Sequence, residues 1–314
     1  MTILLLTNCP LIFCSTTKFE QRTELEIEIK YSKYFDLVFH VLAYLKVHNA
    51  SNLYDTKYIE KMAIEKQNFE YDIIPKISLL QEYYNNNFGR LMMINFLPFY
   101  TTDFNDIKNI FINFNQFTAE DIKYFINPFV EIMENESTFF FDYWDKLYND
   151  NEVLRHLTEK RMKTELEKFS CIFEYYNKSP SVFLSFTITR NGRGFSGIDS
   201  FFSAAIPFPE SDGNFMNSFL MMLHEYTHQF TDELLNRSIN MIDGSHALSE
   251  NVVILTDYYL IKSIDETLIQ DYFKLFGVGN EFEFFNVFKV DENLEIEIKK
   301  LLDDILKKDN IMQH

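Results

Sequence analysis

The chain has 314 residues, of which 46% are hydrophobic and 24% charged, so it has the composition of a globular protein and the length for one large domain or two packed lobes. Its formal net charge of -18 excludes the basic surface that nucleic-acid binding requires, and an anionic membrane surface would repel it. We therefore expect neither nucleic acid nor membrane as partner. A cationic peptide or protein substrate is compatible with the charge, but solubility alone is the favoured explanation of the acidity.

The first 14 residues are apolar, but they lack the positively charged start of a signal peptide, and polar residues and Pro10 interrupt them. They are also too short to span a membrane, so we expect a first strand here. A cytoplasmic location is slightly favoured, and export stays open. Cys9, Cys14 and Cys171 are too few and too scattered for a disulfide framework, and each is expected to be a small buried residue.

Residues 24–29 alternate between charged and apolar side chains, which predicts a half-buried strand. From about residue 33 to residue 178 the apolar residues recur mostly at helical spacing, with single prolines expected to separate the helices. The clearest helical segments are residues 35–47, 56–68 and 152–177. Residues 1–180 are therefore expected to form a mostly helical N-terminal lobe with an early strand.

The pattern changes after residue 180. Residues 182–189 are β-branched and aromatic, and residues 201–208 form a second apolar run, so we expect a hairpin or two adjacent strands. The intervening Asn191-Gly192-Arg193-Gly194 is typical of a turn. Four of the chain's 8 glycines lie between residues 192 and 213, which marks this region as the place where the chain turns most tightly.

The segment His224-Glu225-Tyr226-Thr227-His228 is the main candidate for chemistry. Residues i and i+4 of a helix lie on one face, so the two histidines can bind one metal ion. Glu225, on the adjacent flank, can contact a metal-bound water. Zinc lowers the pKa of such a water towards neutrality and a nearby carboxylate takes its proton, which is the chemistry of the H-E-x-x-H motif.

The motif is expected on an amphipathic helix from about residue 217 to residue 236. Its apolar stripe consists of Leu220, Leu223, Thr227, Phe230 and Leu234. Asn217 or Ser218 can cap the start of this helix. The alternative is a surface helix that carries two histidines and a glutamate by chance.

The third metal ligand is expected from a second helix, which begins near residue 245 or 247 and ends near residue 263. Glu250 lies there among apolar neighbours, where an unpaired buried carboxylate would be costly, so a cation is its simplest partner. The rivals are Asp243, His246 and Asp257, with Asp232 and Glu233 on the motif helix itself. Asp257 lies about 10 Å further along the helix, too far to share the ion, but it can orient a ligand histidine by hydrogen-bonding its other ring nitrogen.

The motif followed by Glu250, 22 residues after His228 and on a separate helix, resembles the gluzincin branch of the zincin metallopeptidases. The resemblance covers about residues 180–262 and implies a zincin-like core with a small sheet, an active-site helix and a ligand helix. It also implies that His224, His228 and Glu250 bind one Zn²⁺ ion and that Glu225 is the general base and acid.

By the same resemblance, a sheet strand facing the cleft would pair with an extended peptide substrate. We expect that edge strand in residues 182–189 or 201–208. The chain departs from the familiar pattern at Ile254, where gluzincins carry an acid four residues after the ligand glutamate. The metzincin extension is also absent, because Leu234 stands at the position of its third histidine.

Four further residues have a functional and a structural interpretation. His246 is a ligand, a transition-state donor or a helix cap. Tyr258 and Tyr259 can supply a phenol that stabilises an oxyanion, or they pack in the core. Arg193 can contact a substrate carboxylate, or it is a solvated turn residue.

We predict an α+β, helix-dominated fold, with the zincin-like core and a helical tail in residues 181–314. The predicted function is zinc-dependent hydrolysis of peptide bonds in a peptide or protein substrate. The first alternative is a zincin-fold protein that binds zinc but does not cleave and acts as a binding module. The second is a helical scaffold in which the motif is accidental. The identity of the substrate and the oligomeric state stay open.

Overall fold

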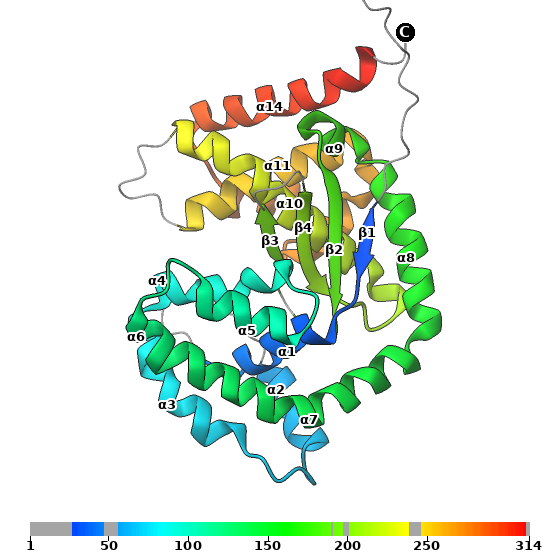
Figure 1. The fold of residues 1–314 in the computed structure, drawn as a ribbon. Helices are drawn as coiled ribbons and strands as arrows, with labels where there is room; N and C mark the ends of the chain where they lie inside the picture. Colours follow the sequence, from blue (N-terminus) through cyan, green and yellow to red (C-terminus); the bar gives the residue numbers. More distant parts are fainter. Residues whose placement is uncertain (1–26, 47–55, 190, 197–200, 239–245, 312–314) are drawn as a thin grey trace, which may run out of the picture.

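The computed structural model describes residues 27–46, 56–189, 191–196, 201–238 and 246–311 (Figure 1). Within these residues helices dominate and one small mixed sheet is present, which confirms the expected α+β class. The strand expected in the first 14 residues lies outside the described part of the chain. Of the strand expected at residues 24–29, the described part begins at residue 27 and contains β1 (Glu28–Lys30).

The N-terminal helices are α1 (Lys33–Leu42), α2 (Thr56–Glu65), α3 (Ile73–Asn86), α4 (Phe88–Leu91), α5 (Phe104–Asn113), α6 (Ala119–Asp121), α7 (Asn127–Asp150), α8 (Glu152–Glu167) and α9 (Ser170–Tyr176), with the short turns η1 (Met92–Asn95), η2 (Leu97–Tyr100) and η3 (Ile122–Ile126). The chain continues through β2 (Ser179–Ser185), β3 (Arg193–Ser196), β4 (Phe201–Pro207), η4 (Asp212–Asn214), α10 (Phe215–Ser238), α11 (His246–Ile264), η5 (Glu266–Leu268), α12 (Ile269–Leu275), α13 (Glu281–Val287) and α14 (Glu292–Ile311). The helical tail is therefore as predicted.

One long predicted helical segment, residues 152–177, is divided into α8 and α9. The break lies at Lys168 and Phe169, and Phe169 is fully buried with its ring centroid 5.8 Å from that of Phe219. The change of direction brings this side chain into the core, which a continuous helix would not do. Asn177 ends α9 in a left-handed conformation with φ of 51°, a common way for a helix to stop.

The four strands form one sheet in the order β1-β2-β4-β3. β1 pairs with β2 and β2 with β4 in parallel, whereas β3 pairs with β4 antiparallel. The segments predicted at residues 182–189 and 201–208 are thus neighbours, as expected, but they are parallel. The hairpin is formed by β3 and β4, and β3 starts at Arg193, inside the segment predicted as a turn.

The prediction of the edge strand is wrong: in the described sheet the edges are β1 and β3, and β2 and β4 are central. The physical reason lies in their continuous apolar runs. Val182, Phe183 and Leu184 are all buried, so β2 is covered on both faces, which is typical of a central parallel strand. Gly194 of β3, and Gly192 just before the strand, allow a close approach to α10 and do not form a turn.

The sheet separates two hydrophobic cores. Because successive side chains of a strand point to opposite faces, Val182 and Leu184 pack with α10 and α11, while Phe183 packs with the N-terminal helices. Ala204 and Ala205 of β4 divide in the same way. Figure 1 shows α1 to α7 gathered on one side of the molecule and α9 to α14 with the sheet on the other.

Asp36 joins the N-terminal helices to the sheet. Its buried carboxylate accepts hydrogen bonds from Trp144 Nε1 of α7 at 2.7 Å, from the Phe186 backbone N–H at 3.1 Å and from the Ser185 hydroxyl. Burial raises the pKa of Asp36 to about 6, and these three donors oppose the rise. The contact fixes α1 and α7 against the end of β2.

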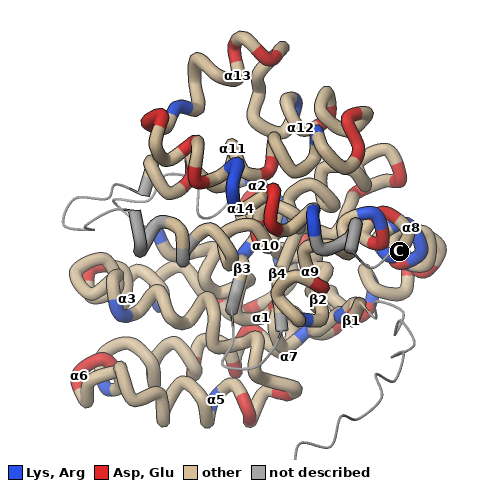
Figure 2. The backbone as a smooth tube through the Cα atoms, turned by 90° about the horizontal axis from the view of Figure 1, so that it is seen from above, with Lys and Arg blue, Asp and Glu red and all other residues tan. Residues whose placement is uncertain are grey.

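Charged residues occupy the outer helices of the described chain, and Figure 2 shows Asp and Glu prominent at α6 and α13 among dispersed Lys and Arg. None of the described helices combines the length and the apolar character needed to cross a membrane. Cys171 is buried, as predicted, whereas Cys9 and Cys14 lie outside the described residues.

Candidate metal centre

Helix α10 carries the H-E-x-x-H motif into the core beside the sheet. Four residues of the predicted stripe, Leu220, Leu223, Thr227 and Phe230, are buried, and the fifth, Leu234, is half-buried against the same core; Tyr226, outside the predicted stripe, is buried as well. The helix begins at Phe215, two residues before the predicted start. Ser218 does not cap it; its hydroxyl donates to the carbonyl of Pro207 at 2.8 Å and ties the helix to the end of β4.

Two further side chains fix the orientation of α10 against the sheet. The hydroxyl of Tyr226, the third residue of the motif, donates to the Ser181 carbonyl of β2 at 2.9 Å. Gln229 Nε2 donates to the Ser203 carbonyl of β4 at 3.0 Å. Because these bonds hold one face of the helix to the strands, His224 and His228 are presented on another.

Helix α11 supplies the third side chain of the site. Its residues 252–258 are all buried, because the helix packs against α10, α12 and α14. Glu250 precedes this buried stretch and is half-buried, with 29% of its side chain exposed. The rigid packing of α11 therefore fixes the backbone from which the Glu250 carboxylate reaches α10.

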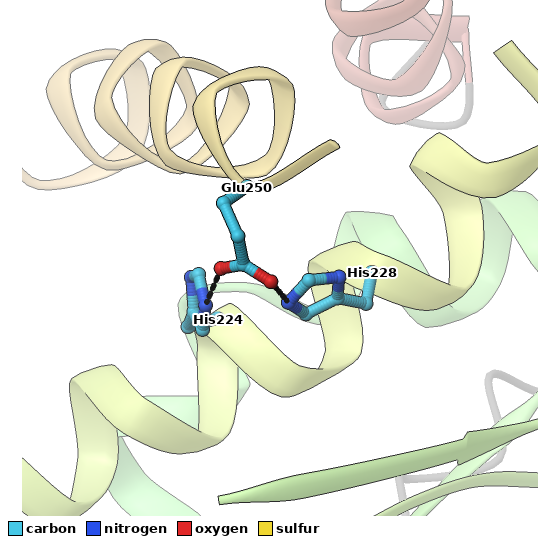
Figure 3. Close-up of side chains that lie close together, drawn as sticks. All are labelled: His224, His228 and Glu250. Carbon is cyan, nitrogen blue, oxygen red and sulfur yellow. Dashed lines mark ion pairs between the residues drawn. The ribbon is translucent and has the colours of Figure 1, made fainter. Parts of the chain in front are cut away.

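His224, His228 and Glu250 form one cluster, in which one ligand atom of each residue lies within 4.8 Å of the other two. Glu250 Oε2 is 3.5 Å from His224 Nε2, and Glu250 Oε1 is 3.5 Å from His228 Nε2. Figure 3 shows the carboxylate, carried by α11, pointing between the two imidazoles of α10. The structure thus brings together the three residues expected to be ligands.

The donor set and its spacing fit a zinc ion. Ligand atoms about 2.1 Å from a tetrahedral zinc ion lie about 3.4 Å from one another. The two nitrogen–oxygen separations of 3.5 Å, one to each oxygen of Glu250, are close to this value, and the three ligand atoms lie within 4.8 Å of one another. A direct hydrogen bond would bring the same atoms to about 2.7–3.2 Å. Two imidazoles and one carboxylate from two helices also leave a fourth position open, as catalytic zinc sites do.

Asp257 orients His224. Its carboxylate accepts a hydrogen bond from His224 Nδ1 at 2.9 Å, one from the Tyr272 hydroxyl at 3.1 Å and one from the Thr227 hydroxyl. Because an ionised carboxylate only accepts, Nδ1 carries the proton of the neutral ring and Nε2 presents its lone pair to the cluster.

Asp257 lies three residues after Ile254, about one turn further along α11. Tyr272 of α12 completes the arrangement, since its hydroxyl lies 2.9 Å from the Ile254 carbonyl as well. The sequence singled out Asp257 but not Tyr272, because nothing in the local pattern of α12 indicates which buried tyrosine faces a carboxylate.

The burial of the cluster is uneven. The His224 side chain is 9% exposed, whereas those of His228 and Glu250 are 25% and 29% exposed, so solvent reaches the site from their side. Burial alone would lower the pKa of His224, but its hydrogen bond to Asp257 and the nearby carboxylate of Glu250 outweigh burial and raise the pKa to about 10. Without a metal ion the ring therefore also holds a proton on Nε2 near neutral pH, and a cation that binds the Nε2 lone pair would have to displace this second proton.

Glu225 lies against β3. Burial raises the pKa of its carboxyl to about 7, while the charges of His224 and Arg193 and a hydrogen bond from the Gly194 backbone N–H lower it. Arg193 is therefore no solvated turn residue: its buried guanidinium donates to the Gly192 carbonyl at 2.6 Å and its charge favours the ionised form of Glu225.

The two tyrosines considered for oxyanion stabilisation have partners away from the metal cluster. The hydroxyl of Tyr258 donates to Glu281 and that of Tyr259 donates to Glu295 Oε1 at 2.6 Å, so both tyrosines have the structural role foreseen for them. Asp243 lies outside the described residues, as do the side chains of Asp232, Glu233 and His246.

No protein family, curated protein or solved structure matches the chain.

Proposed function

We propose that this protein is a zinc-dependent metallopeptidase with a zincin-like core. The observation that carries the proposal is the convergence of His224, His228 and Glu250 from two packed helices. Asp257 supports it, because an aspartate that accepts from the remote nitrogen of a ligand histidine is a common accompaniment of protein zinc sites. The sheet, the motif helix and the ligand helix correspond to the elements that the gluzincin resemblance implies.

His224, His228 and Glu250 would hold the zinc ion, which when bound polarises a carbonyl and acidifies a water molecule. Glu225 accepts a proton from the attacking water as its oxygen bonds to the scissile carbonyl carbon. It then delivers that proton to the leaving nitrogen as the carbon–nitrogen bond breaks. Asp257 keeps the His224 ring in one tautomer and one orientation throughout.

The substrate is proposed to bind along β3. Within the described sheet β3 is an edge strand beside β4, and a sheet edge is where an extended chain can be added. An extended peptide satisfies such an edge by main-chain hydrogen bonds. This replaces the two segments that the sequence favoured for the same role.

The proposal is tested by Glu225→Gln, which keeps the size of the side chain but removes the base. The variant should bind as much zinc as the wild type and lose peptide hydrolysis by on the order of 10²- to 10⁴-fold. Cleavage of a peptide library by the zinc-loaded protein is the measurement. Zinc binding by a wild-type protein that cleaves none of the peptides would favour the binding-module alternative.

A further inference from the structure

Where the start of β3 meets α10, the chain has no side chain at two positions, Gly194 in the strand and Gly192 just before it. A Cβ atom on Gly192 would lie 2.5 Å from Cγ and 2.7 Å from Oε1 of Glu225. A Cβ atom on Gly194 would lie 2.5 Å from the backbone oxygen of Glu225 and 3.1 Å from its Oε2. Real Cβ contacts are essentially never shorter than 3.0 Å, so an alanine at either position would displace Glu225 or the strand.

This crowding is specific to Glu225. A Cβ atom on Gly89 would meet no atom within 4 Å, and one on Gly213 would meet its nearest atom at 3.6 Å. Neither Gly192 nor Gly194 has the positive φ that makes glycine necessary for backbone reasons. The two glycines are thus needed for space and not for conformation.

The strand also bonds to the carboxylate that it touches. The Gly194 backbone N–H donates a hydrogen bond to Glu225, and Gly194 is paired with Ala204 of the central strand β4. Because side chains alternate along a strand, Arg193 belongs to the opposite face, with Ala205 as its partner. At Gly192 and Gly194 the face toward α10 therefore consists of backbone atoms.

We propose that Gly192 and Gly194 are positioning residues for Glu225. Their missing side chains let β3 run so close to α10 that the strand backbone fixes the carboxylate of the general base. This inference rests on the proposed hydrolysis. The strand whose edge would pair with the substrate would also position Glu225, the general base, through the backbone at Gly192 and Gly194.

The decisive variant is Gly192→Ala, because the atoms it would meet belong to the Glu225 side chain, which can swing aside without moving the backbone. It should keep its zinc content and KM while kcat falls about 10²-fold, the loss expected from misplacing a reacting group by about 1 Å. Gly89→Ala is the matched control and should keep wild-type kcat. Wild-type kcat in Gly192→Ala would overturn the proposal.

A second measurement does not depend on activity. In urea unfolding, Gly192→Ala should lower the midpoint in the wild-type background but not in Glu225→Ala, which removes the atoms it would meet. Gly194→Ala should lower the midpoint in both backgrounds, because its nearest contact is a backbone oxygen. Equal losses for Gly192→Ala in the two backgrounds would refute the positioning role of Gly192, whereas a wild-type protein that cleaves no peptide would refute the proposed hydrolysis.

Discussion

At the scale of single residues, the candidate centre depends on a carboxylate that would not touch the metal. Asp257 is completely buried and joins three helices, since its donors lie on α10 and α12 while it belongs to α11. His224 therefore cannot rotate without breaking a bond to a residue that two other donors hold. The orientation of the His224 ring, one of the three proposed ligands, is thus fixed by side chains that would not contact the metal ion.

Asp257→Asn keeps the shape of this side chain but weakens the charge-assisted bond to His224. Zinc affinity should fall by about 10- to 100-fold, the usual effect of removing such a partner, while Glu250→Ala should lower it more. Asp271→Asn is the control, an acid-to-amide change on α12 at a side chain that is 41% exposed and accepts from Lys274 Nζ. Competition with a chromogenic chelator measures the affinities; equal affinity in Asp257→Asn and the wild type would contradict the orienting role.

At the scale of elements, local pattern predicted the motif helix and the ligand helix because each repeats apolar residues over several turns. Glu250 was found for the same reason, as an acid in an apolar helix. The sequence did not predict β3, because its first two residues, Arg193 and Gly194, belong to a segment with two glycines that is also typical of a turn. Only its pairing with β4 and its contact with α10, both distant in sequence, make it a strand.

The start of α6 offers a test at this scale through pH. Asp121 is buried and accepts hydrogen bonds from Arg90 Nε at 3.0 Å, the Tyr83 hydroxyl at 3.0 Å and the Thr118 backbone N–H at 2.9 Å. Burial would raise its pKa, but these donors outweigh burial and hold the pKa well below its ordinary value.

A lowered folded-state pKa means that Asp121 stabilises the protein above its unfolded pKa and that this contribution is lost as pH falls through that value towards the folded one. Asp121→Asn should therefore reduce the free energy of unfolding by about 2 kcal/mol at neutral pH and by less near pH 3. Urea unfolding at both pH values gives the difference. A deficit that grows on acidification would contradict this account of the α6 cap.

At the scale of the whole molecule, the sheet belongs to both cores. β2 and β4 bury side chains with the N-terminal helices on one face and with α10 and α11 on the other. Loss of either core would expose an apolar face of the same strands, so we expect the two to unfold together.

The chain's single tryptophan reports on this coupling, because Trp144 donates to Asp36 at the junction of the N-terminal helices and the sheet. Trp144 fluorescence and far-UV circular dichroism should give coincident urea transitions. Zinc at 100 times its Kd should raise the free energy of unfolding by about 2.7 kcal/mol, and both signals should report the same increase although Trp144 is no part of the cluster. Two separate transitions, with zinc shifting only one, would show that the lobes unfold independently.

The central claim is that His224, His228 and Glu250 form one zinc site, and elemental analysis of the protein after zinc loading and dialysis tests it most directly. The account predicts about one zinc ion per chain in the wild type and in Glu225→Gln, and none retained in His224→Ala or His228→Ala. A wild-type chain that retains no zinc, or histidine variants that retain as much as the wild type, would contradict it.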